Sequence, residues 1–341
     1  MKALFNQSLL AMCLLLNGCI GHDIALVEIQ TGKIVCIDGT QWKQRIISVS
    51  DDYSFFTISR GSKEQLICKY DQNGILIQRQ SLPLFTEFFL IASNYTFLPN
   101  TNCIVYRKDD SNNLYLYDIN NKNEYEIWKD IASTVAGIRF MDWISDKEIL
   151  MVLADDRGVN RNENEIVIIN LVNKTKKVLA KPDHLLFSFA LSPDRTLLAY
   201  LEFLKGHGGQ YIQILDLKKG QVIARLGNGE NVANPVWSLD GKRLGYVQGD
   251  YIMAYTIDKN TLNQVKRLED DILLYGLLMY DDMLIYHFGK EDKKAQEYND
   301  SPLMVYNIQK NTIIKNFNID VNGNRLFYFG PGEKILCEVN E

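Results

Sequence analysis

One short turn recurs along the chain every 41 to 51 residues, and this repeat constrains the fold more than any other feature. The clearest copies are Leu191–Tyr200 (LSPDRTLLAY) and Trp237–Tyr246 (WSLDGKRLGY). In each, an apolar segment meets a Ser-x-Asp turn, and an alternating apolar segment follows. Proline, aspartate, asparagine and glycine favour the corners of tight turns. The aspartate position is filled in seven copies by Asp52, Asn100, Asp146, Asp194, Asp240, Asp281 and Gly332.

A second motif alternates with the first. It is an apolar run that ends in a polar turn, as in Ile166–Lys174 (IVIINLVNK) and Ile212–Gly220 (IQILDLKKG), and it is typical of a strand that enters a β-hairpin. One copy of each motif supplies four strands. Four strands in about 40–50 residues indicate a β-propeller blade. A single blade has two apolar faces, and packing the blades in a ring buries both.

The sequence therefore predicts an all-β fold, a seven-bladed β-propeller of four-stranded blades that occupies residues 24–341 as a single domain. Ile24–Ile37 is a hairpin of the second kind with no partner before it, and Phe329–Val339 is of the first kind with no partner after it. We expect these two hairpins to share one blade and close the ring, which removes open sheet edges.

The turn and the strand after it resemble the PD40 (WD40-like) repeats of TolB-like propellers and of prolyl-oligopeptidase-type propellers. Ser192–Tyr200 and Ser238–Tyr246 carry this resemblance most clearly, and the other five copies match in part. The resemblance implies the fold alone. TolB has an additional N-terminal α/β domain, and the peptidases have a hydrolase domain with a GxSxG motif. This sequence has no counterpart of either, so their functions do not transfer.

Residues 1–18 have the layout of a secretory signal peptide. Lys2 precedes the apolar stretch Leu9–Leu16, and the small residue Gly18 ends the segment. The apolar stretch is short for a bilayer span, although a transmembrane anchor is the alternative.

Leu16–Cys19 (LNGC) resembles the lipobox of bacterial lipoproteins, with Asn17 as a departure from its pattern. The resemblance implies cleavage before Cys19, acylation of Cys19, and a lipidated tether over residues 19–23. Two or three acyl chains form a stable membrane anchor. Ile20 follows the cysteine, and in enteric lipoproteins a residue other than aspartate there implies the outer membrane, at its periplasmic face. A structural cysteine in a secreted protein is the alternative.

Composition excludes some classes of function. The 37 basic and 42 acidic residues give a net charge of −5, and no basic run suggests a nucleic-acid partner. The four histidines and scattered cysteines offer no metal-ligand pattern. We therefore expect no catalytic residues, no metal and no cofactor apart from the lipid on Cys19. Four further cysteines could pair in three ways or remain buried thiols: Cys36, Cys68, Cys103 and Cys337.

Five residues are candidates for partner contact. Trp42 and Trp128 lie in predicted connections between blades, where an exposed tryptophan can anchor a partner or fill a gap in the packing. Asp155 and Arg157 lie in the acidic loop 154–165, which is a solvated blade loop or a calcium site without EF-hand spacing. His207 lies in the glycine-rich loop of LKGHGGQY.

These features predict a monomeric, lipid-anchored protein of the bacterial envelope that binds an envelope protein or peptide without catalysis. One alternative is a propeller enzyme of the lactonase or dehydrogenase type, with acidic or histidine side chains converging in the central channel. Another is a surface-exposed lipoprotein that binds an external ligand.

Overall fold

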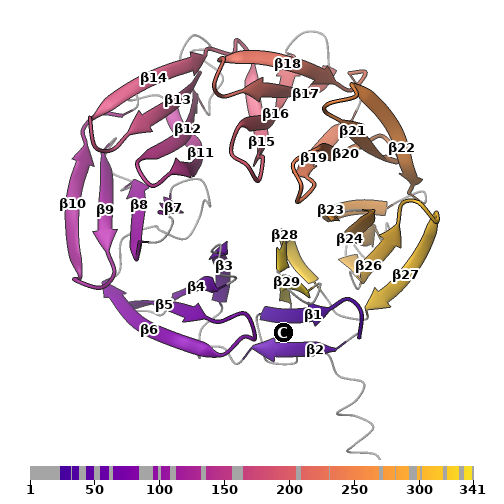
Figure 1. The fold of residues 1–341 in the computed structure, drawn as a ribbon, viewed down its shortest axis with the longest axis horizontal. Helices are drawn as coiled ribbons and strands as arrows, with labels where there is room; N and C mark the ends of the chain where they lie inside the picture. The colour runs from indigo at the N-terminus through magenta and orange to yellow at the C-terminus, as the bar shows by residue number, and fades with distance from the viewer. Residues whose placement is uncertain are drawn as a thin grey trace, which may run out of the picture.

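The computed structural model describes residues 24–31, 33–37, 44–49, 54–60, 64–83, 95–98, 101–107, 113–131, 136–155, 164–204, 209–229, 231–268, 272–280, 282–291, 298–299, 302–317, 321–329 and 334–339. Every regular element within these ranges is a β-strand. The strands form seven sheets arranged as a ring (Figure 1). The predicted seven-bladed β-propeller is therefore confirmed.

Each blade is an antiparallel sheet whose strands follow one another from the centre of the ring to its rim (Figure 1). We number the blades 1 to 7 and label their strands A to D from the inside outwards. Blade 1 contains β3 (Gln44–Val49), β4 (Phe55–Arg60), β5 (Glu64–Tyr70) and β6 (Leu76–Pro83); blade 2, β7 (Tyr95–Phe97), β8 (Cys103–Arg107), β9 (Leu114–Asp118) and β10 (Asn123–Trp128); blade 3, β11 (Ala136–Ser145), β12 (Glu148–Asp155), β13 (Glu165–Asn170) and β14 (Thr175–Ala180).

The remaining four blades continue this order around the ring. Blade 4 contains β15 (Leu185–Leu191), β16 (Leu197–Leu204), β17 (Gly209–Asp216) and β18 (Gln221–Leu226); blade 5, β19 (Val232–Trp237), β20 (Arg243–Gln248), β21 (Tyr251–Thr256) and β22 (Thr261–Arg267); blade 6, β23 (Ile272–Tyr280), β24 (Met283–Glu291), β26 (Leu303–Asn307) and β27 (Thr312–Phe317), with β25 (Tyr298–Asn299) paired to β24; blade 7, β28 (Val321–Phe329), β29 (Lys334–Val339), β1 (Ile24–Glu28) and β2 (Ile34–Ile37).

The ring has two chemically different faces. Because neighbouring strands run antiparallel, the A–B and C–D turns of every blade lie on one face, which we call the turn face. The B–C connections and the links from one blade to the next begin on the other, which we call the loop face. The turn motifs found in the sequence therefore all belong to the turn face.

The core consists of apolar layers between neighbouring blades. One layer joins Leu150 and Ile166 of blade 3 to Leu198 and Leu215 of blade 4, and these side chains are completely buried. Equivalent layers join blade 2 to blade 3, blade 4 to blade 5 and blade 5 to blade 6. Burying apolar surface stabilises the fold by about 25 cal/mol per Å². Because the blades form a ring, each sheet has a neighbouring blade on both faces, and both faces are buried.

The C–D turns form because an acidic or amide side chain caps them. The Oδ1 atom of Asp216 accepts hydrogen bonds from the backbone N–H groups of Lys218 at 3.0 Å and Lys219 at 2.8 Å. Asn170 accepts equivalent bonds from the two residues that lie at the same places in its turn. Aspartate and asparagine commonly stabilise turns in this way. This requirement explains the polar residue that ends each apolar run in the second motif.

Blade 7 closes the ring with strands from both ends of the chain. Strand β1 pairs antiparallel with β29, with Ile24 opposite Glu338 and Glu28 opposite Lys334. The side chains of Ile24 and Leu336 are completely buried between blade 7 and blade 1. The predicted sharing of one blade by the two terminal hairpins is confirmed. Strand β1 begins at the loop face and ends at the turn face.

Candidate functional site

The Ser-x-Asp turns are closed by hydrogen bonds inside each turn. Ser192 Oγ donates to Asp194 Oδ1 at 2.6 Å, and Thr196 Oγ1 donates to Asp194 Oδ2 at 2.8 Å. In blade 5, Ser238 Oγ donates to Asp240 Oδ1 at 2.6 Å. Burial acts to raise the pKa of Asp194, but these hydrogen bonds outweigh it and place the pKa below its ordinary value. The carboxylates of these turns act as structural acceptors.

Arg195 connects blade 4 to blade 3. Its guanidinium carbon lies 3.1 Å from the centre of the Trp143 ring, and its Nη1 atom donates to the Trp143 carbonyl oxygen at 2.7 Å. The same Nη1 atom lies 3.7 Å from Asp142 Oδ1. Burial raises the pKa of the Asp142 carboxyl, and the positive charge of Arg195 opposes that rise. Arg195 thus links blades 3 and 4 to each other at the turn face.

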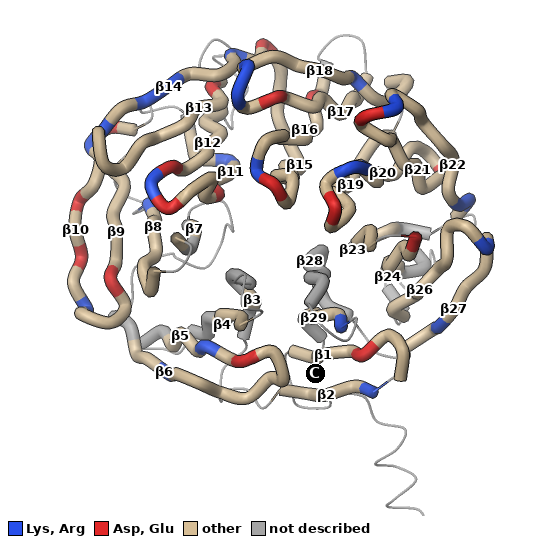
Figure 2. Tube along the Cα trace, in the orientation of Figure 1, with Lys and Arg blue, Asp and Glu red and all other residues tan. Residues whose placement is uncertain are grey.

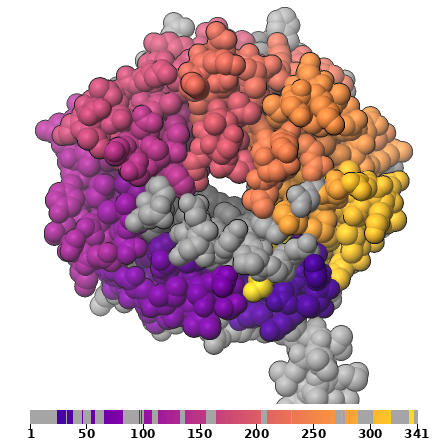
Figure 3. Space-filling view, viewed as in Figure 1, coloured from indigo at the N-terminus to yellow at the C-terminus, as the bar shows by residue number. Residues whose placement is uncertain are grey.

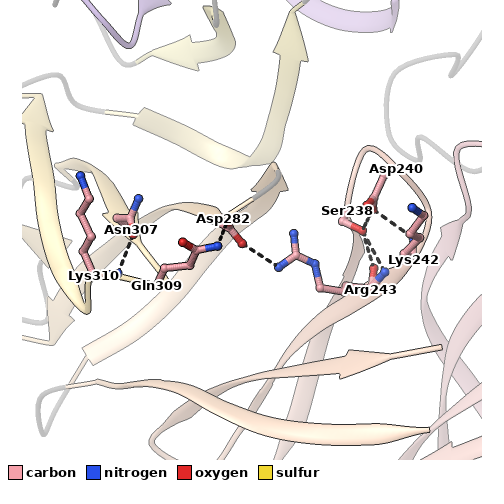
Figure 4. Close-up of polar contacts among 8 residues, drawn as sticks. All are labelled: Ser238, Asp240, Lys242, Arg243, Asp282, Asn307, Gln309 and Lys310. Atoms are coloured by element: carbon pink, nitrogen blue, oxygen red, sulfur yellow. Dashed lines mark hydrogen bonds and ion pairs between the residues drawn. The ribbon is translucent and has the colours of Figure 1, made fainter. Parts of the chain in front are cut away.

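A similar link joins blade 5 to blade 6. Arg243 Nη1 lies 3.4 Å from Asp282 Oδ1, and Asp282 Oδ2 accepts a hydrogen bond from Gln309 Nε2 (Figure 4). Figure 4 also shows the Ser238–Asp240 pair on the turn that precedes Arg243. Figure 2 shows charged residues at the inner turns between β15 and β16 and between β19 and β20. The turn face therefore carries a partial ring of charges close to the centre.

A groove opens on the turn face between blades 3 and 4. It has a volume of about 380 Å³, within the range usual for ligand-binding pockets. Blade 3 contributes side chains from all four of its strands, and blade 4 contributes its A–B and C–D turns. The lining residues are Ile144, Glu148, Ile168, Asn170, Thr175, Lys177, Arg195, Thr196, Leu217 and Lys218.

Positive charge predominates in this groove. Lys177, Arg195 and Lys218 face a single acidic residue, Glu148. Glu148 accepts a hydrogen bond from Asn170 Nδ2 at 3.4 Å. Arg195 is paired with Asp142, whereas Lys177 and Lys218 form no ion pair within the described part of the chain. The groove therefore has two unpaired ammonium groups over a partly apolar lining.

The equivalent position between blades 7 and 1 has a smaller groove in which one of the lining lysines, Lys334, is paired. Its volume is about 100 Å³. Lys334 occupies the strand-B position and lies 4.0 Å from Glu28 Oε1 on strand C. Lys334 Nζ also donates to the Gln72 carbonyl oxygen at 3.5 Å and to Asn73 Oδ1 at 3.4 Å, both in the next blade. A satisfied lysine thus occupies this groove, in contrast to the one between blades 3 and 4.

Of the residues that the sequence singled out for partner contact, the two that are described, Trp128 and Asp155, do not line the groove. Trp128 ends β10 and packs, partly buried, against the core layer between blades 2 and 3. Asp155 ends β12. Both strand ends belong to the loop face. Cys19, Trp42, Arg157 and His207 lie outside the described residues, so their contacts remain predictions.

Most groove residues lie within the two repeated motifs, but the motifs predict strands and turns and do not mark any of these residues for ligand binding. Lys177 is the third residue of an outer strand, and Lys218 lies in the C–D turn of the following blade. Their positions within the repeat are the sequence feature that could have identified them. If each blade is aligned with the next, the third residue of strand D and the following C–D turn come together at one junction.

Trp143 and Trp237 lie at contacts between neighbouring blades. Trp237 is buried, and its Nε1–H group donates to the carbonyl oxygen of Ala190 in the preceding blade at 2.8 Å. Trp143 packs against the layer between blades 2 and 3 and stacks on Arg195. Both residues therefore help to join neighbouring blades.

Three cysteines of the propeller are thiols. Cys68 and Cys337 are buried and Cys103 is half-buried, while Cys36 is disulfide-bonded. Burial raises the pKa values of the Cys68 and Cys103 thiols. None of the three pairings possible among these four cysteines occurs.

Metal sites and membrane helices are absent from the residues that can be described. Within those ranges no three histidine, cysteine or acidic side chains come together as a metal site. Nor does any helix in the same ranges have the length and hydrophobicity needed to cross a bilayer. The space-filling view shows an opening at the centre of the ring (Figure 3).

No family model matches the sequence, and no curated protein matches it. Solved structures do resemble the fold. An oligogalacturonate lyase in complex with manganese is 13% identical over 93% of this chain and 96% of its own, with a TM-score of 0.62. A prolyl endopeptidase is 11% identical over 91% of this chain and 45% of its own, with a TM-score of 0.59.

TolB from Acinetobacter baumannii is 13% identical over 95% of this chain and 65% of its own, with a TM-score of 0.44. Sequence identities this low describe a shared architecture. The propeller fold implied by the turn motifs is thus confirmed by the seven-sheet ring and by the likeness to the prolyl endopeptidase, for the fold alone. The chain is a seven-bladed β-propeller with a cationic groove between blades 3 and 4.

Proposed function

We propose that this chain is a lipid-anchored protein of the bacterial envelope, tethered to the periplasmic side of the outer membrane, whose propeller binds another envelope protein and performs no catalysis. Two sequence features support this location, the signal-like segment 1–18 and the lipobox-like Leu16–Cys19. The rigid ring of blades supports a binding role, because turns on a rigid scaffold present side chains with little loss of conformational entropy.

The observation that carries the proposal is where β1 begins. Ile24 lies at the loop face, five positions after Cys19 with only four residues between them. An extended chain of five residues spans at most about 18 Å. A lipid on Cys19 therefore keeps the loop-face side of blade 7 close to the membrane. The turn face, with its groove, is left accessible to a partner.

The groove also lies far from the anchor around the ring. Blades 3 and 4 are each three positions away from blade 7, so the junction between them is opposite blade 7 (Figure 1). A partner at this junction would not compete with the membrane for space.

Two readouts test the proposal, both with a Cys19→Ala variant as the matched control. The first is incorporation of labelled palmitate in growing cells, which we expect for the wild-type chain and not for the variant. The second is crosslinking in intact cells followed by purification of the chain. We expect one dominant envelope protein with the wild type and reduced capture with the unanchored variant.

Each readout can contradict a different part of the proposal. A wild-type chain that incorporates no lipid contradicts the anchor. A lipidated chain that captures no reproducible partner contradicts the binding role, and the central opening would then be screened for metal and for enzymatic activity.

A further inference from the structure

The groove between blades 3 and 4 combines an apolar floor with uncompensated positive charge. Ile144, Ile168 and Leu217 supply aliphatic surface. Lys177 and Lys218 approach from different blades, one from the outer strand β14 and the other from the C–D turn of blade 4. Oppositely charged ligands bind preferentially to such a site, because the two ammonium groups attract the same anion.

Three lysines close to Lys177 and Lys218 in the sequence are already paired. The neighbouring Lys176 and Lys181 bind Glu165 at 2.6 Å and 3.1 Å. Lys219, adjacent to Lys218, lies 3.4 Å from Asp216 Oδ2. Among the described residues, Lys177 and Lys218 therefore differ from these three lysines in having no acidic partner.

The dimensions of the groove favour a ligand larger than a single carboxylate. Glu148, Asn170 and Thr175 lie side by side on strands B, C and D, as their registers show. Strands are about 4.8 Å apart, so the groove extends over roughly 10 Å. An ion would occupy only part of it and leave the aliphatic floor uncovered.

We propose that this groove binds an acidic peptide segment that also carries aliphatic side chains. The carboxylate would lie between the ammonium groups of Lys177 and Lys218, and an aliphatic side chain would cover Ile168 and Leu217. The inference rests on the proposed binding function and specifies the chemistry of the partner. The hydroxyl of Thr175 and the amide of Asn170 offer additional hydrogen bonds to a peptide backbone.

A purified system tests this inference directly. The probe is a fluorescein-labelled hexapeptide of alternating leucine and glutamate, titrated with the detergent-solubilised full chain and followed by fluorescence anisotropy. The groove variant combines Lys177→Glu with Lys218→Glu. The matched control combines Lys259→Glu with Lys310→Glu, which are exposed lysines in the C–D turns of blades 5 and 6. The two double variants have the same net charge.

We expect saturable binding that weakens about tenfold or more in the groove variant and changes less than twofold in the control. Raising the salt concentration from 0.05 to 0.3 M should also weaken it, because screening reduces attraction between exposed charges. A peptide with glutamine in place of glutamate, or alanine in place of leucine, should bind clearly less well.

Several results would overturn the inference. These are the absence of saturable binding, equal losses in both double variants, and equal binding of the glutamine peptide. Equal binding of the alanine peptide would reveal a simple carboxylate site instead of a peptide site. Peptide binding without any partner in cells contradicts only the envelope function, whereas a partner captured equally by the groove variant contradicts only this inference.

Discussion

Arg195 has a backbone conformation that arginine rarely adopts. Its φ is +60°, and the equivalent turn of blade 5 has Gly241 with a φ of +69°. Residues other than glycine are strained in this region by about 1 kcal/mol or more. Arg195 retains the conformation because its guanidinium stacks on Trp143 and donates to the Trp143 carbonyl oxygen.

This balance predicts the effect of replacing Arg195. Arg195→Ala loses the stacking and the hydrogen bond but keeps the strain, so we expect the free energy of unfolding to fall by about 2 kcal/mol. Arg195→Gly relieves the strain and should lose less. Urea unfolding of the purified chain measures both. An Arg195→Gly protein more stable than the wild type would show that the contacts with Trp143 contribute less than the strain costs, and an Arg195→Ala protein as stable as the wild type would show that they contribute nothing.

The turn carboxylates predict how stability depends on pH. Asp194 and Asp240 have lowered pKa values in the folded chain: burial raises them, and hydrogen bonds from Ser192 and Ser238 more than offset it. The fold therefore favours their ionised forms. Their contribution to the free energy of unfolding is complete above pH 3.8, the ordinary pKa of aspartate. It is lost as the pH falls through the lowered pKa of the folded chain.

We expect the melting temperature to fall below about pH 4 and the Asp240→Asn variant to show a shallower fall. Thermal unfolding followed by circular dichroism between pH 3 and 7 measures the difference between the two proteins. Identical pH profiles would mean that Asp240 makes no ionisation-dependent contribution.

At the scale of the elements, the contacts between neighbouring blades are what stabilise the turn face. Trp237 on β19 reaches the Ala190 carbonyl oxygen on β15 through its indole N–H. Trp237→Phe should remove this hydrogen bond, leave the carbonyl oxygen without its donor, and lower the free energy of unfolding by about 1 kcal/mol. Tyr125→Phe on the exposed strand β10 is the control, and it should change the free energy of unfolding by less than about 0.5 kcal/mol.

Denaturant titration compares these two variants with the wild-type chain. If Trp237→Phe unfolds at the same denaturant concentration as Tyr125→Phe, the hydrogen bond between blades 4 and 5 does not contribute to stability.

The blades could be predicted from the sequence because each one repeats the same local requirements. Ser192 and Ser238 close their turns with the same hydrogen bond, and Asp216 and Asn170 cap their C–D turns alike. Such contacts join residues close in sequence, so a periodic pattern reveals them.

The groove could not be predicted in this way. Lys177 and Lys218 are 41 residues apart in the numbering, and they meet only because blade 4 packs against blade 3. The relative position of two blades depends on the side chains of the layer between them, such as Leu150 and Leu215. No single repeat contains that information.

At the scale of the whole molecule, the closure of the ring determines which face the proposed lipid anchor would hold near a membrane. Strands β1 and β29 hold both ends of the described chain in blade 7 at the loop face. The short distance in sequence between Cys19 and Ile24 then limits how far the propeller can turn away from a lipid anchor. The turn face is available for binding only if the anchor approaches from the loop face.

The most direct test of this account is energy transfer from the chain to the membrane. A donor dye is placed at Asp250→Cys on the loop face or at Lys259→Cys on the turn face, in a background with Cys36→Ser and Cys103→Ser. These exposed positions flank β21, whose six residues separate them by about 20 Å. The lipidated chain is incorporated into vesicles that contain an acceptor lipid. The account predicts stronger transfer from position 250. Equal transfer, or stronger transfer from position 259, would contradict it.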